Sequence, residues 1–247
     1  MMKQHWLTVC VVVCASPCWA APFVFNDIQH WVGAGSQRAA LVIDWDGAAA
    51  TDQAAVWGYR WDGTATGKDM LLAVAADPTA RLFVRVGTPS AFGVPLYGLG
   101  YDRNGNGQFG ISDGTTFVNG VAVTGVPDAS GASTATDPGD AYREGWYTGF
   151  WHYVTGNGNP FDGGAWVEDP TGMSGRTLTN NAWDGYAFDA DFSSFSAFTD
   201  LPANPVAAVP EPAGPTLVLA AVLFAGWLLW RRARADAQAV AAAPQTK

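Results

Sequence analysis

Beyond residue 18 the sequence contains no cysteine, and all three of its cysteines fall within the first 20 residues. That opening segment has Lys3 near its start, an apolar core, and Ala20 before a second alanine. This order is typical of a secretory signal peptide that is cleaved before Ala21. We therefore expect a signal peptide over residues 1–20, and a mature chain without disulfides or thiolate chemistry.

Histidine is scarce as well, because only His30 and His152 lie beyond the expected signal peptide. They are too few and too isolated in sequence to predict a catalytic triad or a zinc site. No serine-hydrolase, metalloprotease or phosphate-binding motif appears. Paired carboxylates such as Glu168-Asp169 could serve glycoside hydrolysis, but in so acidic a chain we expect solvated loop carboxylates. The sequence therefore favours a protein that is not an enzyme.

Lysine and arginine are also scarce. Residues 21–208 contain 20 Asp and Glu against 8 Lys and Arg, so this part carries a net charge of −12. Such a surface repels nucleic acids and other polyanions and tolerates divalent cations. We therefore exclude nucleic acid as a partner.

The chain is rich in glycine, proline, asparagine and aspartate, interleaved with short β-branched and aromatic runs. This pattern predicts a mainly β fold with one or two short helices, in a single exported domain over residues 21–200. The expected strands cover residues 40–45, 56–61, 81–86, 144–155, 165–168 and 186–188, and the expected helix covers residues 68–76. We expect a long hairpin over 89–120, an exposed insertion over 126–140 and a turn over 180–185.

A candidate calcium loop begins at Asp102. The predicted oxygen ligands follow the spacing of calcium loops and are Asp102, Asn104, Asn106, the backbone carbonyl of Gln108, and Asp113. The alternative is an Asn-Gly turn that closes a hairpin, which favours the same residue types. Calcium is therefore a candidate cofactor at this stage, with no certain one.

Tryptophan is abundant, with 12 residues in the chain. Tryptophan in loops can stack on sugar rings, and the residues expected in loops are Trp146, Trp166 and Trp183. The alternative is that the aromatic residues supply the core, because each buries about 150–250 Å². The sequence favours the core for most of them and leaves these three as candidate ligand-stacking residues.

The C-terminal part has three segments in order. Residues 201–212 form a Pro/Ala-rich segment, expected to be a linker, that ends in Val209-Pro210-Glu211-Pro212. Residues 213–230 contain no charge and would reach about 27 Å as a helix, enough to cross a bilayer core. Arg231 and Arg232 follow, so the positive-inside rule places residues 231–247 in the cytoplasm and the domain outside.

This order of a Val-Pro-Glu-Pro motif, one transmembrane helix and an arginine cluster resembles the PEP-CTERM protein-sorting signal. The resemblance implies a Gram-negative, exopolysaccharide-producing bacterium in which an exosortase is the partner that cuts the protein near the motif. It also implies an inner-membrane precursor with a periplasmic domain, and then release to the cell surface or biofilm matrix. A plain membrane anchor is the alternative.

A second resemblance concerns the domain. Trp57-Gly58-Tyr59-Arg60-Trp61-Asp62-Gly63 and a later Trp-Asp-Gly at residues 183–185 are similar to a family of secreted bacterial proteins. The pattern also resembles small β-grasp domains related to the C-terminal part of transcobalamin, which implies a corrinoid ligand. We therefore expect a non-enzymatic surface or matrix protein, in contact with exopolysaccharide. The alternative is a ligand-binding module for carbohydrate or corrinoid.

Overall fold

The computed structural model describes residues 22–46, 54–127, 132–146, 149–190 and 200–209. It confirms a mainly β fold with two short α-helices. The expected signal peptide, the motif at 210–212, the apolar run 213–230 and the arginines at 231 and 232 lie outside the described residues. Within the described part of the chain, no helix has the length and apolar character needed to cross a membrane.

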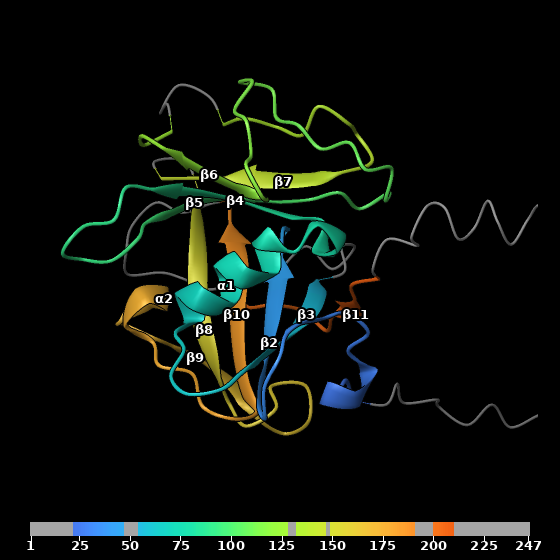
Figure 1. Ribbon diagram of the computed structural model, residues 1–247, viewed down its shortest axis with the longest axis vertical. Coiled ribbons are helices and arrows are strands. Elements are labelled where there is room, and N and C mark those ends of the chain that lie inside the picture. Colours follow the sequence, from blue (N-terminus) through green and yellow to red (C-terminus); the bar gives the residue numbers. More distant parts are fainter. Residues whose placement is uncertain (1–21, 47–53, 128–131, 147–148, 191–199, 210–247) are drawn as a thin grey trace, which may run out of the picture.

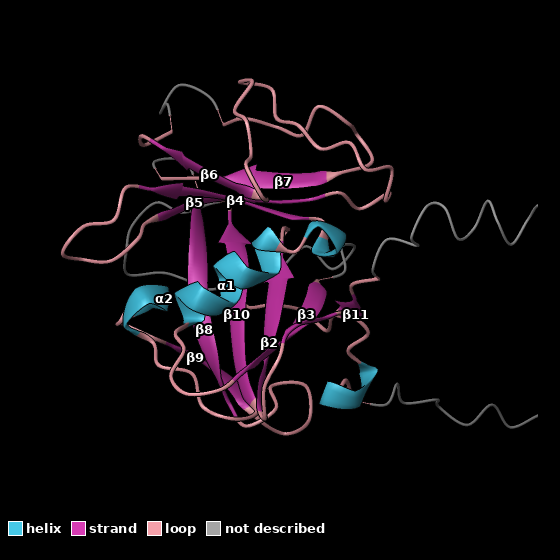
Figure 2. Cartoon of the chain, viewed as in Figure 1, coloured by secondary structure: helices cyan, strands magenta, loops and turns pink. Residues whose placement is uncertain are grey.

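The described chain alternates short strands with long connections (Figure 2). The strands are β1 Trp31–Gly33, β2 Gln37–Asp44, β3 Ala55–Trp61, β4 Leu82–Gly87, β5 Leu96–Tyr101, β6 Val121–Thr124, β7 Ala141–Glu144, β8 Phe150–Asn157, β9 Ala165–Glu168, β10 Ala182–Asp189 and β11 Val206–Ala207. The α-helices are α1 Gly67–Ala76 and α2 Gly172–Gly175, and the 3-10 helices are η1 Phe25–Asp27 and η2 Pro78–Ala80.

A seven-stranded sheet forms the centre of the fold. Its order is β1-β3-β2-β10-β8-β9, and β11 pairs with β3 beside β1. The central strands β2 and β10 run parallel to each other, whereas β2 with β3 and β10 with β8 are antiparallel. Every residue of β10 is buried, because this strand is covered on both faces. Sheet strands covered on both faces read as continuous apolar runs, which explains Leu41-Val42-Ile43 in β2.

Helix α1 lies across one face of this sheet (Figure 1). Thr66 caps its first turn, because the Thr66 hydroxyl oxygen accepts a hydrogen bond from the Asp69 amide, while Asp69 accepts one from the Thr66 amide. This is the capping box that the sequence around residue 66 permits. Met70, Leu71 and Val74 of α1 are fully buried, and they form one core cluster with Trp57 and other residues of the sheet.

The opposite face of the sheet has a smaller core. Trp183 is at its centre, next to Val42 and Val56, and only 1% of its surface is exposed. The rings of Phe25 and Phe161 pack against Trp183, with centroids 4.7 and 5.6 Å away. Aromatic side chains therefore supply much of the apolar area on both faces, as expected for a domain without disulfides.

A second, four-stranded sheet has the order β6-β4-β5-β7 and lies across one end of the first (Figure 1). On β5, Gly98 and Gly100 leave room for bulky neighbours. A Cβ at Gly100 would lie 2.1 Å from the Phe109 ring, and one at Gly98 would lie 2.4 Å from the Tyr142 hydroxyl. The Phe109 ring in turn stacks on Phe83 of β4 at 4.0 Å. The loop after β5 therefore covers this sheet.

Three expected elements need correction. Residues 144–155 do not form one strand, because Glu144 ends β7 in the four-stranded sheet and β8 of the seven-stranded sheet begins at Phe150. The expected turn at 180–185 is a turn at 179–181 followed by β10, which begins at Ala182. The region 89–120 forms no hairpin of its own, because β5 pairs back onto β4 and the next strand, β6, lies parallel to β4.

The expected linker from residue 201 is also corrected as far as residue 209. The Ala203 amide donates to the buried Asp44 carboxylate, and the Val206 and Ala208 amides donate to backbone carbonyls of β3 and of the residue before it. Ala208 is 2% exposed, within the main core. Finally, Arg81 Nη2 donates to the Val209 carbonyl at 2.6 Å. Residues 200–209, here called the C-terminal strap, therefore belong to the folded unit.

Candidate functional site

A cavity of about 600 Å³ lies on the side of β8 and β10. Its floor includes Trp151, Tyr153 and Tyr186, which project from these two strands toward the side that α1 covers. Met173 of α2 closes one flank, and the loop between β4 and β5 closes another. In Figure 1, α2 and this loop lie on the same side of the molecule, beside β8. A cavity of this size suits one small ligand.

The cavity wall is mainly apolar and aromatic. Trp146 lies on it, with its ring centroid 5.4 Å from that of Tyr97 and 6.3 Å from that of Phe150. Phe92 also lies on the wall and is completely exposed, at 101% of its reference area. Phe92 and Trp146 therefore add aromatic surface to the cavity wall that a ligand can contact.

The charged groups on the wall are all acidic or imidazole. Glu168 and Asp169 lie on it, together with His152, whereas none of the lining residues that the structure describes is lysine or arginine. The His152 ring is held by the strap, since its Nδ1 is 2.9 Å from the Asp200 carbonyl oxygen, and its Nε2 is 3.6 Å from Glu168 Oε1. The cavity therefore repels anions and can accept hydrogen bonds from hydroxyl or ammonium groups.

Below the floor lies a buried polar pair. The Tyr153 hydroxyl donates a 2.5 Å hydrogen bond to Asp184 Oδ2, and Arg176 Nε is 3.5 Å from Asp184 Oδ1. Burial raises the pKa of Asp184 to about 6, although Tyr153 and Arg176 both favour its charged form. Burial also raises the pKa of Tyr153 far above its ordinary value. Because Asp184 is not on the cavity wall, the pair fixes the Tyr153 ring as part of the floor.

The structure separates the three tryptophans proposed for stacking. Trp146 lies on the cavity wall, as that role requires. Trp183 is a core residue of the opposite sheet face, so the prediction for it is wrong. Trp166 packs edge-on against Phe161 and donates its indole N–H to the Pro202 carbonyl, so it holds the strap and not a ligand.

The structure places some of the predicted calcium ligands close together. Asp102 is buried, and its carboxylate accepts hydrogen bonds from the amides of Gly105, Asn106 and Gly107. The Asn104 side-chain oxygen accepts the Asn106 amide, and the Asn106 side-chain oxygen accepts the Gln108 amide. The loop does not close a hairpin, because it joins β5 to a long connection before β6. The turn alternative is therefore wrong in that form.

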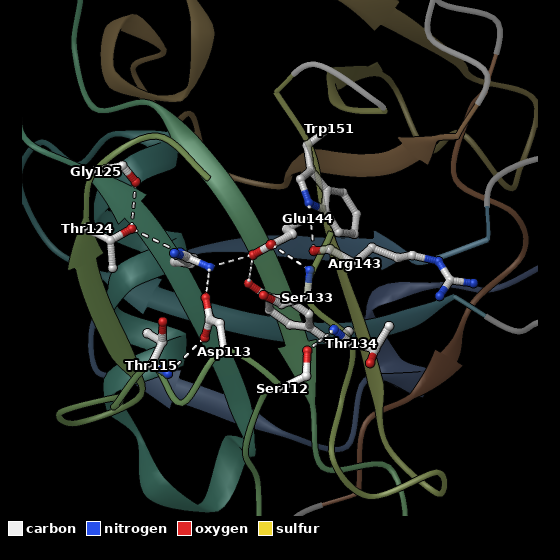
Figure 3. A network of polar contacts seen from close by, with 12 residues as sticks. Ser112, Asp113, Thr115, Thr124, Gly125, Ser133, Thr134, Arg143, Glu144 and Trp151 are labelled. Carbon is white, nitrogen blue, oxygen red and sulfur yellow. Dashed lines mark hydrogen bonds and ion pairs between the residues drawn. The ribbon is translucent and has the colours of Figure 1, made fainter. Parts of the chain in front are cut away.

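Asp113 does not complete this loop. Arg85 of β4 donates from Nη1 to Asp113 Oδ2 and to Glu144 Oε2, both at 2.7 Å (Figure 3). Glu144 also accepts hydrogen bonds from the Tyr142 hydroxyl and the Ser133 amide. Burial opposes the charge of Asp113, but the Thr115 amide and Arg85 outweigh it and lower the pKa of Asp113. The sequence prediction of Asp113 as the twelfth-position ligand is therefore corrected, because this carboxylate belongs to the Arg85 network.

Two carboxylates that sequence spacing did not reveal approach the loop from residues 137–140. Asp137 Oδ2 accepts hydrogen bonds from the side-chain amides of Asn104 and Asn106, at 3.1 and 2.8 Å. Both carboxylate oxygens of Asp140 are buried without a hydrogen-bond partner that meets standard geometry. Burial and the nearby charges of Asp102 and Asp137 raise the pKa of Asp140 to about 6. These residues were expected to lie in an exposed insertion.

The described residues contain no group of three or more His, Cys, Asp or Glu side chains placed to hold a metal ion. A cation at this loop would therefore need the two asparagine oxygens as well as the carboxylates. Calcium binding at Asp102, Asn104 and Asn106 stays a prediction.

Most of the cavity carries no local signal in the sequence. Its residues come from the β4–β5 loop, β8, β10 and the α2 region, and only folding brings these segments together. The run Ser90-Ala91-Phe92-Gly93 was one available hint, because an aromatic residue in a tight polar turn has no core to join. Comparisons of this chain with protein-family models, with curated proteins and with solved structures found no match.

Proposed function

We propose that this protein is an exported, non-enzymatic binding protein of the cell surface or extracellular matrix, whose cavity beside β8 takes a neutral carbohydrate. The observation that carries the ligand-binding part is the cavity of about 600 Å³ with Trp146 and the exposed Phe92 on its wall. Flat aromatic faces pack against the apolar faces of sugar rings, and a cavity of this size encloses a ligand of a few rings.

The charges on the wall support a neutral rather than an anionic sugar. Glu168 can accept hydrogen bonds from hydroxyl groups, whereas Asp169 already accepts them from the Thr171 amide and hydroxyl, and no described lining residue is a lysine or arginine that could bind a carboxylate or phosphate. A corrinoid is the competing ligand. It suits the apolar wall, but its phosphate would face these two carboxylates.

Delivery rests on the C-terminal segments. We propose that residues 213–230 anchor a precursor in the inner membrane and that an exosortase cuts near Val209-Pro210-Glu211-Pro212, releasing the domain to the surface or biofilm matrix. The folded unit reaches at least to Val209, whose carbonyl accepts a hydrogen bond from Arg81, so a cut after Val209 would keep residues 200–209 in the released domain. Intact mass of the native protein, from cells with and without the exosortase, tests the processing.

The ligand is tested by titrating neutral oligosaccharides, acidic oligosaccharides and a corrinoid into the purified protein while tryptophan fluorescence is recorded. We expect a neutral oligosaccharide to shift or quench the emission, and Trp146→Ala to weaken its binding by roughly tenfold or more, since truncation of an aromatic binding residue commonly costs about 2 kcal/mol or more. Trp166→Phe is the matched control, because Trp166 lies outside the cavity, and it should bind as wild type does. Equal loss in both variants, or tight binding of acidic sugars only, would argue against the proposal.

A further inference from the structure

The C-terminal strap ends close to the expected membrane anchor. Its last contact holds Val209, and the apolar run begins at Ala213. Even a fully extended chain covers only about 3.3–3.6 Å per residue, so these four steps reach at most about 14 Å. If the run crosses the bilayer, the edge of the domain that holds Val209 cannot move far from the lipid headgroups.

That edge can be identified from the sheet topology. β11 and β1 both pair with the same side of β3, β11 with Ala55 and Val56 and β1 with residues 58–60. Together they form one end of the seven-stranded sheet, here called the β1/β11 edge. The cavity lies beside β8, which is four strand positions away from β1, or roughly 19 Å at the usual spacing of about 4.8 Å.

The exposed residues of the β1/β11 edge suit a lipid surface. Val206 and Val209 are 42% and 54% exposed, whereas most large apolar residues of the domain are buried. Trp31 of β1 is half-buried, and the Arg60 guanidinium lies over its ring at 4.6 Å. Arg81 stands beside Val209. Tryptophan and arginine are the side chains that favour the headgroup region, and Arg60 and Arg81 are two of only 8 basic residues in this acidic domain.

We infer that the anchored protein rests with its β1/β11 edge against the membrane surface, so that the cavity at the far side of the sheet opens away from the lipid. This inference rests on the proposed anchor at residues 213–230. It adds an orientation that neither the anchor nor the cavity implies alone. The partner is the zwitterionic or weakly acidic headgroup layer of a bilayer, contacted by Val206, Val209, Trp31 and the two arginines.

Single cysteines test the orientation. In the full chain with Cys10, Cys14 and Cys18 changed to serine, Val206→Cys and, separately, Val118→Cys are labelled with an environment-sensitive fluorophore. Val118 is the matched site, because it is also an exposed valine, at 68%, and lies before β6 at the outer edge of the second sheet. Each protein is placed in phosphatidylcholine vesicles that contain a lipid with a nitroxide on its headgroup.

We expect several-fold stronger quenching at position 206 than at position 118. A flexible Gly-Ser insertion of about 20 residues between Val209 and Pro210 should reduce this difference, because the tether then no longer restrains the domain. Thermal melting of each labelled protein confirms that the domain is folded. Equal quenching at both sites, or stronger quenching at 118, in protein that floats with the vesicles would overturn the orientation alone. Protein that does not float with the vesicles would overturn the anchor, and the orientation with it.

Discussion

Asp140 is the residue whose environment departs most from what its position in a loop suggests. Its carboxylate is buried beside Asp102 and Asp137, which raises its pKa from 3.8 to about 6. The folded protein therefore binds a proton more tightly than the unfolded chain between pH 3.8 and about 6. In that window the contribution of Asp140 to the free energy of unfolding falls as the pH rises, and above it the charged carboxylate destabilises the fold.

Asp140→Asn should therefore stabilise the metal-free protein at pH 7, by on the order of 1–2 kcal/mol after allowance for partial exposure. The gain should shrink as the pH is lowered toward 4, where Asp140 of the wild type is protonated. Chemical denaturation at the two pH values measures both effects. A substitution that destabilises the protein equally at both pH values would show that the Asp140 carboxylate is satisfied in the fold.

Calcium would reverse the sign of this effect. A cation bound among Asp102, Asn104 and Asn106 would place positive charge near Asp140 and favour the charged form of its carboxylate. Millimolar calcium should then raise the melting temperature of the wild type by a few degrees, and that of Asp140→Asn by much less. Asp113→Asn is the comparison, because Asp113 faces Arg85 and should leave the calcium response intact. A wild type that does not respond to calcium in melting or calorimetry has no site here.

At the scale of elements, the four-stranded sheet is tied together by charge. Arg85 on β4 and Glu144 on β7 lie in one row on either side of Gly98 of β5, so their side chains meet across a position without a side chain. Glu144 is 2% exposed, and its carboxylate accepts hydrogen bonds from three protein groups. Glycine at position 98 is therefore required for the ion pair as well as for the Tyr142 hydroxyl.

Glu144→Gln should lower the free energy of unfolding by about 3–5 kcal/mol, because it leaves the Arg85 charge buried with only one carboxylate. Asp113→Asn removes the other, more exposed partner of the same arginine and should cost about 1 kcal/mol or less. Denaturant titration of the two variants measures the difference. Similar losses of unfolding free energy in both variants would mean that the burial of Glu144 does not strengthen its interaction with Arg85.

Elements with a local signal were predictable. Helix α1 shows its cap at Thr66 and its apolar stripe in sequence, and the alternation in β3 places its aromatic residues correctly. Non-local pairing gave no such signal. The run from 144 to 155 does not show that Glu144 ends a strand of one sheet and that Phe150 begins a strand of the other. The Pro/Ala-rich residues 201–208 likewise carry no sign that part of them pairs with the edge of β3.

The same limit applies to the candidate sites. The Asp-x-Asn-x-Asn spacing correctly predicted that Asp102, Asn104 and Asn106 lie in one loop, because residues so close in sequence need only local hydrogen bonds to stay together. It chose Asp113 as a further ligand by counting residues, whereas the carboxylates that approach the loop come from a separate segment. Trp146 and Trp183 look equivalent in sequence, because burial of an aromatic residue depends on elements that are distant in the chain, such as Phe25 and Phe161 around Trp183.

The whole molecule carries a strong negative field. With 20 acidic and 8 basic residues between positions 21 and 208, self-repulsion opposes the compact state, and salt screens it with a Debye length of about 8 Å at 0.15 M. Sodium chloride should therefore raise the melting temperature from a low-salt buffer to about 0.15 M, and choline chloride should match it. A fall in melting temperature with both salts would mean that ion pairs such as those of Arg85 outweigh the net repulsion.

The closing position of the C-terminal strap has a consequence for how the chain folds. The pairing of β2 with β10 aligns distant residues such as Ala39 and Ala182, the Arg38 amide donates to the side-chain oxygen of Asn180 142 positions later, and β11 adds the last edge of the sheet. A fold with such distant contacts forms slowly and cannot form from its first half. A chain that emerges N-terminus first would stay incomplete until residue 209 has appeared, directly ahead of the apolar run. Secretion would therefore deliver an unfinished domain, and folding would become complete only where the anchor holds it.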